Sequence, residues 1–214
     1  MAFNISRCYK QDRIVYQAEV VTPMFLAGAD QSRAEMRAAS IKGLLRYWWR
    51  VCSTIESVDE LRKREQILFG SAETNKSQVV ISLEEGKIIR TKEIKLPNHP
   101  YELKKNDKVF KLNILDYLAY GTYEYQKGTG NVFVRERIEP ESTFNIVLNI
   151  KDLNCRDEVT SAFHAMVTFG GLGSRQKNGF GCLRIDGTEH TFKPSGLGLR
   201  DFPSLSDKAR LFMF

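Results

Sequence analysis

The sequence of 214 residues has few cysteines and histidines and no long apolar run. Its four cysteines form no C-x-x-C pair, and its three histidines are equally scattered. This spacing argues against a zinc ribbon, a disulfide framework or a catalytic metal cluster of His and Cys, so we expect no metal and no cofactor. No apolar stretch is long enough to span a bilayer, and the first residues lack the hydrophobic region of a signal peptide. We therefore expect a cytoplasmic protein with no membrane partner.

The net charge is +6, and most of the excess lies in one segment. Residues 87–111 contain eight Lys and Arg against three Asp and Glu, whereas the counts are 12 against 11 in residues 1–86 and 12 against 12 in residues 112–214. The segment is either a solvated surface insertion or a basic arm that lies along a polyanion, and charge alone does not choose between them.

The periodicity of apolar side chains predicts an alternation of strands and helices. Strands are expected at residues 13–22, 78–83, 143–150 and 182–185, and helices from near Ser40, as N-cap, and over residues 156–169. The order strand–helix–strand–strand–helix–strand is that of an α+β, ferredoxin-like (RRM-like) domain. Residues 86–140 would be a long basic insertion between the two middle strands. We expect this domain to cover residues 1–190, followed by a C-terminal extension over residues 191–214.

The first predicted helix carries an apolar stripe and a row of cations. The apolar residues at helical spacing, which should face the core, are Ile41, Leu44, Leu45, Trp48 and Cys52. Lys42, Arg46 and Arg50 recur every fourth residue and share another face, with no acid among them. The row therefore either binds an external anion, helped by the backbone at Ser40 and Gly43, or forms a solvated basic face. Trp49 lies nearer this face and either stacks on a base or packs under the insertion.

A glycine-rich loop follows the second predicted helix. Residues 170–181 contain five glycines together with Arg175 and Lys177. Such a run allows a tight turn or a close approach to a ligand, and its cations indicate an anion. No G-K-[S/T] closes it as in a Walker loop, and Gln176 stands where a dinucleotide fingerprint has its third glycine. It is either a structural turn or a wall that contacts a string of phosphates.

Four segments together resemble one protein family. They are T-P-M-F-L-A-G-A-D at residues 22–30, A-E-M-R-A-A-S-I-K-G-L-L-R-Y-W-W-R at residues 34–50, L-F-G-S at residues 68–71, and the glycine loop. The S-I-K-G-x-x-R segment and the glycine loop resemble RAMP superfamily proteins generally. The R-Y-W-W-R and G-A-D segments resemble, in particular, the first RAMP subunit of the type III-B CRISPR effector complex.

The resemblance implies a non-catalytic RNA-binding subunit that acts in antiviral defence. Its expected partners are CRISPR guide RNA, target RNA and other RAMP subunits. Base pairing between guide and target would supply the sequence specificity, because contacts to phosphates position RNA without reading it. The expected RNA contacts, as two walls of one groove, are Ser40, Lys42, Gly43, Arg46, Trp49, Arg50, Gly170, Gly171, Gly173, Arg175 and Lys177.

Two other functions remain open at this point. Some RAMP relatives use an aspartate in the loop before the first helix, where Asp30 lies, and a metal ion there would make the protein an endoribonuclease. The alternative role of Asp30 is to cap a turn, and His164 is expected to be a packed or surface histidine. The second possibility is a purely structural assembly subunit.

Members of the family usually carry a second ferredoxin-like domain after the glycine loop. This chain ends about thirty residues beyond the loop, in an apolar stretch over residues 211–214. We expect a short or split version, a tail that docks on a neighbouring subunit, or part of a longer chain.

Overall fold

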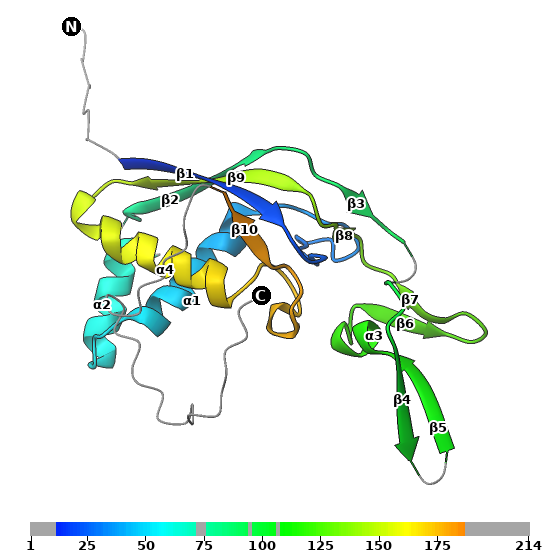
Figure 1. Cartoon of the computed structure of the whole chain (residues 1–214). Coiled ribbons are helices and arrows are strands. Elements are labelled where there is room, and N and C mark those ends of the chain that lie inside the picture. The colour runs from blue at the N-terminus through cyan, green and yellow to red at the C-terminus, as the bar shows by residue number, and fades with distance from the viewer. Residues whose placement is uncertain (1–11, 72–75, 94–95, 106–107, 187–214) are drawn as a thin grey trace, which may run out of the picture.

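The main sheet has four antiparallel strands. The computed structural model describes residues 12–71, 76–93, 96–105 and 108–186. The strands are β1 (Asp12–Val20), β2 (Val79–Glu85), β9 (Thr143–Ile150) and β10 (Leu183–Ile185), in the spatial order β10-β1-β9-β2. All four lie where alternation of side chains predicted them, because each strand buries one face against the helices. The predicted α+β class is confirmed (Figure 1).

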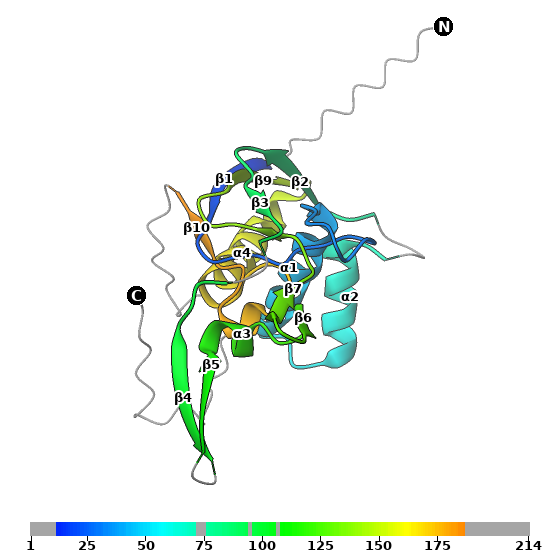
Figure 2. The ribbon, with the colours of Figure 1, turned by 90° about the vertical axis from the view of Figure 1, so that its right-hand side faces the viewer.

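Three helices cover one face of this sheet. They are α1 (Ala38–Cys52), α2 (Val58–Phe69) and α4 (Arg156–Phe169), and both ribbon views place them on the same side (Figures 1 and 2). Helix α4 has the predicted bounds. Helix α1 begins two residues before Ser40, and its N-cap Arg37 makes no side-chain capping bond. The predicted N-cap role of Ser40 is therefore wrong, and Ser40 lies inside the first turn.

Helix α2 was absent from the sequence prediction, although its start carries a local signal. The Ser57 hydroxyl accepts a hydrogen bond from the Glu60 backbone N–H at 3.5 Å. Serine followed three residues later by glutamate is the spacing of a capping box. This pattern could have located the helix.

The core lies between the sheet and the helices. Its largest fully buried side chains from these elements include Ile41, Leu45, Trp49, Phe144, Ile146, Leu148, Ile150 and Phe163. Trp49 is only 1% exposed, whereas Trp48 is partly buried. The fully buried tryptophan is therefore Trp49 and not Trp48 as predicted, because α1 packs against both α2 and α4 and turns Trp49 inward; Trp48 packs against the same core from its edge. The Trp49 indole N–H donates to Glu158 Oε1 at 2.6 Å, which satisfies its polar atom in the core.

The chain between β2 and β9 forms a set of small elements. These are β3 (Arg90–Thr91), β4 (Pro100–Lys105), β5 (Lys108–Asn113), α3 (Ile114–Leu118), β6 (Tyr123–Gln126), β7 (Gly130–Phe133) and β8 (Arg137–Ile138). Strand β3 pairs with β8, and β4–β5 and β6–β7 are hairpins. The β4–β5 hairpin projects away from the main sheet (Figures 1 and 2).

A second, smaller core joins these elements to the main body. Its buried residues are Phe25, Leu96, Ala119, Phe133 and Phe180. Phe25 precedes α1 and Phe180 belongs to the glycine loop, so this core ties that loop to the chain between β2 and β9. The apolar tail predicted to dock on a neighbour, within residues 191–214, lies outside the described residues.

The different burial of Trp48 and Trp49 leads to a stability prediction. Trp49→Ala should lower the free energy of unfolding by about 3–5 kcal/mol, because it leaves a cavity in the core and removes the indole donor to Glu158 Oε1, while Arg64 still donates to Oε2. Trp48→Ala is the matched control and should cost less than about 2 kcal/mol. Urea titration followed by circular dichroism measures both. Equal losses, or a larger loss for Trp48→Ala, would contradict the burial seen here.

Candidate nucleic-acid interface

The glycine loop, residues 170–181, folds back on the chain that leaves β1. The Ser174 N–H donates to the Phe25 carbonyl at 2.8 Å, and the Gly181 N–H donates to the Pro23 carbonyl at 3.0 Å. Within the loop, the Leu172 N–H donates to the Gly181 carbonyl at 2.8 Å. These backbone bonds make the loop a rigid structural turn, one of the two roles expected for it.

Close backbone contact explains why glycine occupies this loop. Gly181 has φ +70°, and a Cβ atom there would lie 1.9 Å from the Leu172 carbonyl oxygen. Cβ atoms on Gly170, Gly171 and Gly173 would lie 2.5, 3.0 and 2.4 Å from backbone carbonyl oxygens. No real Cβ atom fits at 2.5 Å or less. These glycines therefore serve internal packing. Leu172 and Phe180 of the loop are buried, whereas its cations Arg175 and Lys177 are exposed.

Two cations of the loop remain available to an external anion. Arg175 and Lys177 are exposed, and neither forms an ion pair with any other described residue. The Asn178 side chain donates to the Leu118 carbonyl at 2.7 Å, which holds this part of the loop against α3. A fixed backbone thus presents both cations beside α3.

The cations of α1 have partners inside the protein. Glu65 of α2 accepts a hydrogen bond from Arg46 Nε and lies 3.6 Å from Arg50 Nε. The predicted absence of an acid was wrong, because the helix that supplies Glu65 was not foreseen. Glu65 is 8% exposed, and one buried carboxylate compensates part of the charge of two guanidinium groups.

Lys42 and Lys151 form a positive cluster next to Arg46. The Lys42 ammonium donates to Ser77 Oγ at 2.8 Å, and Lys151 donates to the Ser77 carbonyl at 3.1 Å. Burial, and the nearby charges of Arg46 and Lys151, lower the pKa of Lys42. Within the described part of the chain neither lysine pairs with a carboxylate. This cluster keeps an uncompensated positive charge beside α1.

The remaining residues predicted on α1 differ in their access. Gly43 is exposed, and a Cβ atom there would meet nothing within 4 Å. Ser40 is partly buried. Trp49 is in the core, so the prediction that it stacks on a base is wrong in this structure.

The two predicted walls contact different neighbours. Arg46 and Arg50 face α2, and Lys42 faces the start of β2, whereas Arg175 and Lys177 lie beside α3. No hydrogen bond or ion pair between described residues joins the two sets of cations. Their union in one groove stays a prediction.

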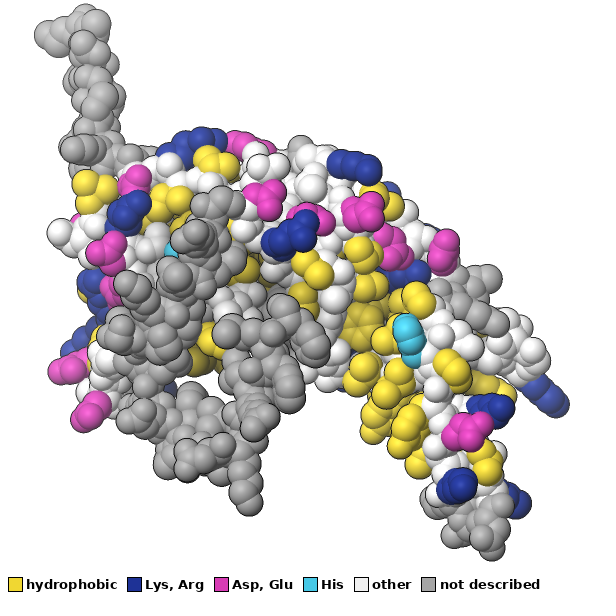
Figure 3. Space-filling model, in the orientation of Figure 1, with side chains coloured by type: hydrophobic (Ala, Val, Ile, Leu, Met, Phe, Trp, Pro, Cys, Tyr) yellow, Lys and Arg dark blue, Asp and Glu magenta, His cyan; other side chains and the backbone are white. Residues whose placement is uncertain are grey.

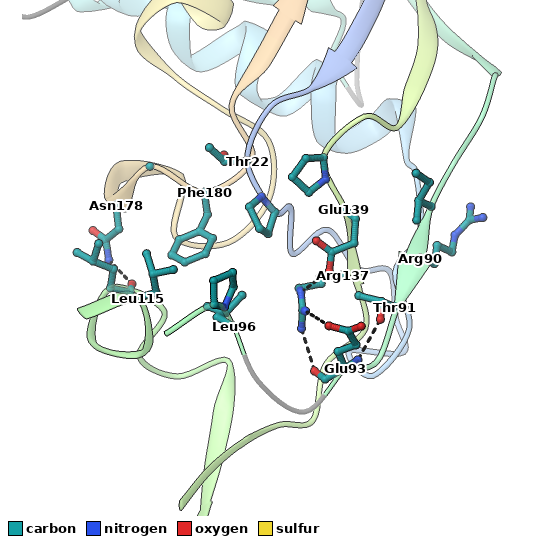
Figure 4. A pocket seen from close by; sticks show the side chains of 16 residues that line it. Thr22, Arg90, Thr91, Glu93, Leu96, Leu115, Arg137, Glu139, Asn178 and Phe180 are labelled. Atoms are coloured by element: carbon teal, nitrogen blue, oxygen red, sulfur yellow. Dashed lines mark hydrogen bonds and ion pairs between the residues drawn. The ribbon is translucent and has the colours of Figure 1, made fainter. Parts of the chain in front are cut away.

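A cavity of about 540 Å³ lies between the glycine loop, β3, α3 and β8 (Figure 4). Its buried cation is Arg137, whose side chain is 2% exposed. Arg137 Nε lies 2.7 Å from Glu139 Oε1, and its Nη1 donates to the Glu93 carbonyl at 2.9 Å. The Glu93 carboxylate is also 3.8 Å from Arg137 Nη2. Two carboxylates therefore compensate the charge of this buried guanidinium.

Asp30 caps a turn, which was one of the two roles predicted for it. Its Oδ1 accepts hydrogen bonds from the Ser32 hydroxyl at 2.7 Å and the Ser32 N–H at 2.9 Å. These bonds lower the pKa of the exposed Asp30 carboxyl. Among the described residues no group of three His, Cys, Asp or Glu could hold a metal ion.

His164 packs against Tyr16, with ring centroids 5.9 Å apart. In the described ranges no helix has the length and apolarity to cross a membrane.

Comparison with known proteins gives one family. The family model described as the RAMP superfamily matches residues 17–184. The chain is 25% identical over 182 residues to the CRISPR system Cmr subunit Cmr1-2 of Pyrococcus furiosus, covering 80% of this chain and 94% of that protein. It is 29% identical over 157 residues to Cmr1-1 of the same organism, covering 71% and 40%. The chain therefore spans most of one curated relative and two fifths of the other.

Two solved structures share the fold. The crystal structure of Cmr1 from Pyrococcus furiosus, in its apo form, matches with a TM-score of 0.51 and 21% identity, over 84% of this chain and 51% of that one. A chain of the type III-B Cmr-β complex bound to cognate target RNA matches with a TM-score of 0.50 and 12% identity, over 82% and 58%. At these identities the two likenesses concern the fold alone.

The pairing between α1 and α2 can be tested through Glu65. Glu65→Gln should lower the free energy of unfolding by about 1–2 kcal/mol, because Arg46 and Arg50 lose their shared buried carboxylate. The loss stays modest because both guanidinium groups are partly exposed and solvent screens their charge. Glu56→Gln is the matched control, since Glu56 is exposed and has no ion pair in the described part of the chain. Chemical denaturation of both variants gives the comparison. A loss for Glu65→Gln no larger than for Glu56→Gln would show that Glu65 does not hold these helices.

Proposed function

Because this chain belongs to the RAMP superfamily, we propose that it is a non-catalytic RNA-binding subunit of a type III-B CRISPR ribonucleoprotein. Its curated relatives are named as Cmr subunits, and one structure of the same fold is a complex bound to cognate target RNA. The observation that carries the proposal is the glycine loop, a fixed backbone that presents Arg175 and Lys177 with no carboxylate partner in the described chain. The subunit acts in the cytoplasm, beside other subunits of the effector complex.

The strand order supports the finer description of the fold. Numbered along the chain, the four main strands lie in the order 4-1-3-2, and every neighbouring pair is antiparallel. A helix follows the first strand and another follows the third, as in the split β-α-β arrangement. The domain is accordingly ferredoxin-like, it extends over residues 1–190, and residues 86–140 are an insertion between its middle strands.

RNA is held mainly by contacts to its phosphates. Lys42, Arg175 and Lys177 supply the direct contacts, and Lys151 adds to the charge beside Lys42. Arg46 and Arg50 contribute less, because they share Glu65. The exposed backbone at Gly43, beside the partly buried Ser40, leaves room for the strand. The glycines Gly170, Gly171 and Gly173 act by holding the loop in place, and sequence specificity comes from guide–target pairing.

The endoribonuclease alternative can be tested directly at Asp30. We expect no cleavage when the protein is incubated with complementary RNA and Mg²⁺, because the Asp30 carboxylate already caps a turn. Gel analysis of the RNA is the measurement, with the Asp30→Ala variant run in parallel. Cleavage by the wild type that Asp30→Ala abolishes would overturn the non-catalytic assignment.

RNA binding through phosphates predicts a characteristic salt dependence. The double variant Lys42→Gln/Lys177→Gln should bind all single-stranded RNA sequences more weakly by the same factor. The slope of log K against log salt should become shallower by about 1.4, because two phosphate contacts are lost. Fluorescence anisotropy at several salt concentrations measures the slope.

The control for this experiment is a lysine on another surface. Lys63 of α2 is exposed and has no ion pair within the described ranges. Lys63→Gln should therefore leave the slope unchanged. Equal slopes for the wild type and the double variant would remove Lys42 and Lys177 from the RNA-binding surface.

A further inference from the structure

We propose that Tyr120 stacks on the base of an unpaired nucleotide whose phosphate is bound by Arg175. This inference rests on the proposed RNA-binding function and narrows it to a single-stranded segment of RNA. Tyr120 belongs to the turn after α3, and Arg175 belongs to the glycine loop. The two residues are 55 positions apart in the sequence, and the fold brings their segments together.

Tyr120 is an exposed ring on a well-anchored support. Its side chain is 70% exposed, although the preceding residue, Ala119, is fully buried. The ring of Tyr120 meets Tyr123 edge to face, with centroids 6.3 Å apart, and Tyr123 meets Phe133 in the same way at 5.5 Å. Phe133 in turn stacks on Phe25 of the small core. An edge contact fixes the ring and leaves most of its surface open for a base.

The backbone of this turn is also fixed. Thr122 is buried, and both its N–H and its hydroxyl donate to the Ala119 carbonyl, at 3.0 and 2.7 Å. The Tyr120 N–H donates to the Tyr117 carbonyl at 3.3 Å. Tyr120 therefore needs little ordering when a base arrives.

Arg175 lies directly beside this turn. A Cβ atom on Gly121 would be 2.6 Å from Arg175 Nη2, so the guanidinium covers the residue that follows Tyr120. Gly121 has φ +87°, and its lack of a side chain allows this approach. Arg175 itself has φ +61°, an uncommon conformation for a residue with a side chain, which indicates that the loop holds it in place. Lys177 adds a second exposed cation to the same loop.

The chemistry of the pair fits a nucleotide. A tyrosine ring stacks on any base, and a guanidinium binds a phosphate through two parallel hydrogen bonds. The guanidinium of Arg175 has no acid partner among the described residues, so its charge is available to a phosphate. A duplex would hide its base faces in the stack, which makes a single strand the ligand.

The open face of the main sheet offers no alternative place for stacking. RRM domains stack bases on aromatic side chains of that face. Here the exposed positions of β1 and β2 that point away from the helices are Arg13, Val15, Gln17, Val80, Ser82 and Glu84. None of these is aromatic. Exposed hydrophobic side chains gather instead around α3 and the base of the β4–β5 hairpin (Figure 3).

The test uses the full chain and a defined RNA. The probe is a 12-nucleotide single-stranded RNA with one 2-aminopurine, and the same strand paired in a blunt duplex serves as comparison. Tyr120→Ala should weaken binding of the single strand roughly 5- to 150-fold and abolish the quenching of 2-aminopurine. Binding of the duplex should change less than about twofold. Tyr120→Phe should retain both affinity and quenching, because the ring and not the hydroxyl does the stacking.

Two further variants complete the experiment. Tyr125→Ala is the matched control, since Tyr125 is 75% exposed on β6 and makes no ring contact with another described aromatic residue, and it should leave binding unchanged. Arg175→Gln should reduce the slope of log K against log salt by about 0.7 for the single strand. Thermal unfolding of each variant establishes that it is folded.

The outcomes separate this inference from the proposed function. If the wild type binds RNA and Lys42→Gln/Lys177→Gln weakens it, but Tyr120→Ala binds the single strand like the wild type, the stacking site is wrong and the function stands. The same conclusion follows if Tyr120→Ala only prevents co-purification with other subunits, because the surface is then a protein interface. If the wild type binds no RNA alone or in its complex, the proposed function fails as well.

Discussion

The packing of the glycine loop against residues 23–26 is the contact on which the candidate interface depends. Its hydrogen bonds join backbone to backbone, and they form only where no Cβ atom stands between the two segments. This contact connects the end of β1 with the start of β10, two neighbouring strands of the sheet. It also places Phe180 beside Phe25, at a centroid distance of 5.5 Å, and so joins the chain between β2 and β9 to the body of the protein. The position of Arg175 beside α3 is a consequence of this close approach.

An internal carboxylate partner divides the cations of α1 and the glycine loop into two groups. Glu65 is almost completely buried, and leaving it without a cation would cost the desolvation of an unpaired carboxylate. Arg46 and Arg50 therefore stabilise the pairing of α1 with α2. Arg175 and Lys177 pair with no carboxylate in the described chain. Lys42 donates a hydrogen bond to the Ser77 hydroxyl and lies near other cations. A polyanion would gain most at the second group, because its cations do not have to leave an internal carboxylate.

The regular elements could be predicted because each has one buried face. Strand β9 and helix α4 were predicted with their bounds, since their apolar side chains repeat with the period of a strand and of a helix. Helix α2 was missed because it is polar on most positions and buries only Glu65, Leu68 and Phe69. This one omission led to the belief that Arg46 and Arg50 had no acid partner. The choice between Trp48 and Trp49 failed for a related reason: two adjacent residues differ by only 100° around a helix, and the position of a second neighbouring helix decides which one is buried.

In the candidate site, local features could be predicted from the sequence, whereas contacts between distant segments could not. The sequence predicted that Arg175 and Lys177 lie in a turn, and the structure shows them exposed there. The proximity of Arg175 to the turn that carries Tyr120 depends on a contact between segments 55 residues apart, for which no local pattern exists.

Photo-crosslinking of single-stranded RNA that carries 4-thiouridine, with mass spectrometry of the linked peptides, tests the location of the RNA most directly. We expect crosslinks to the peptides that contain Tyr120 and residues 175–177. Crosslinks confined to the open face of the sheet, around Val15 and Val80, would contradict an RNA-binding surface formed by the glycine loop and α3.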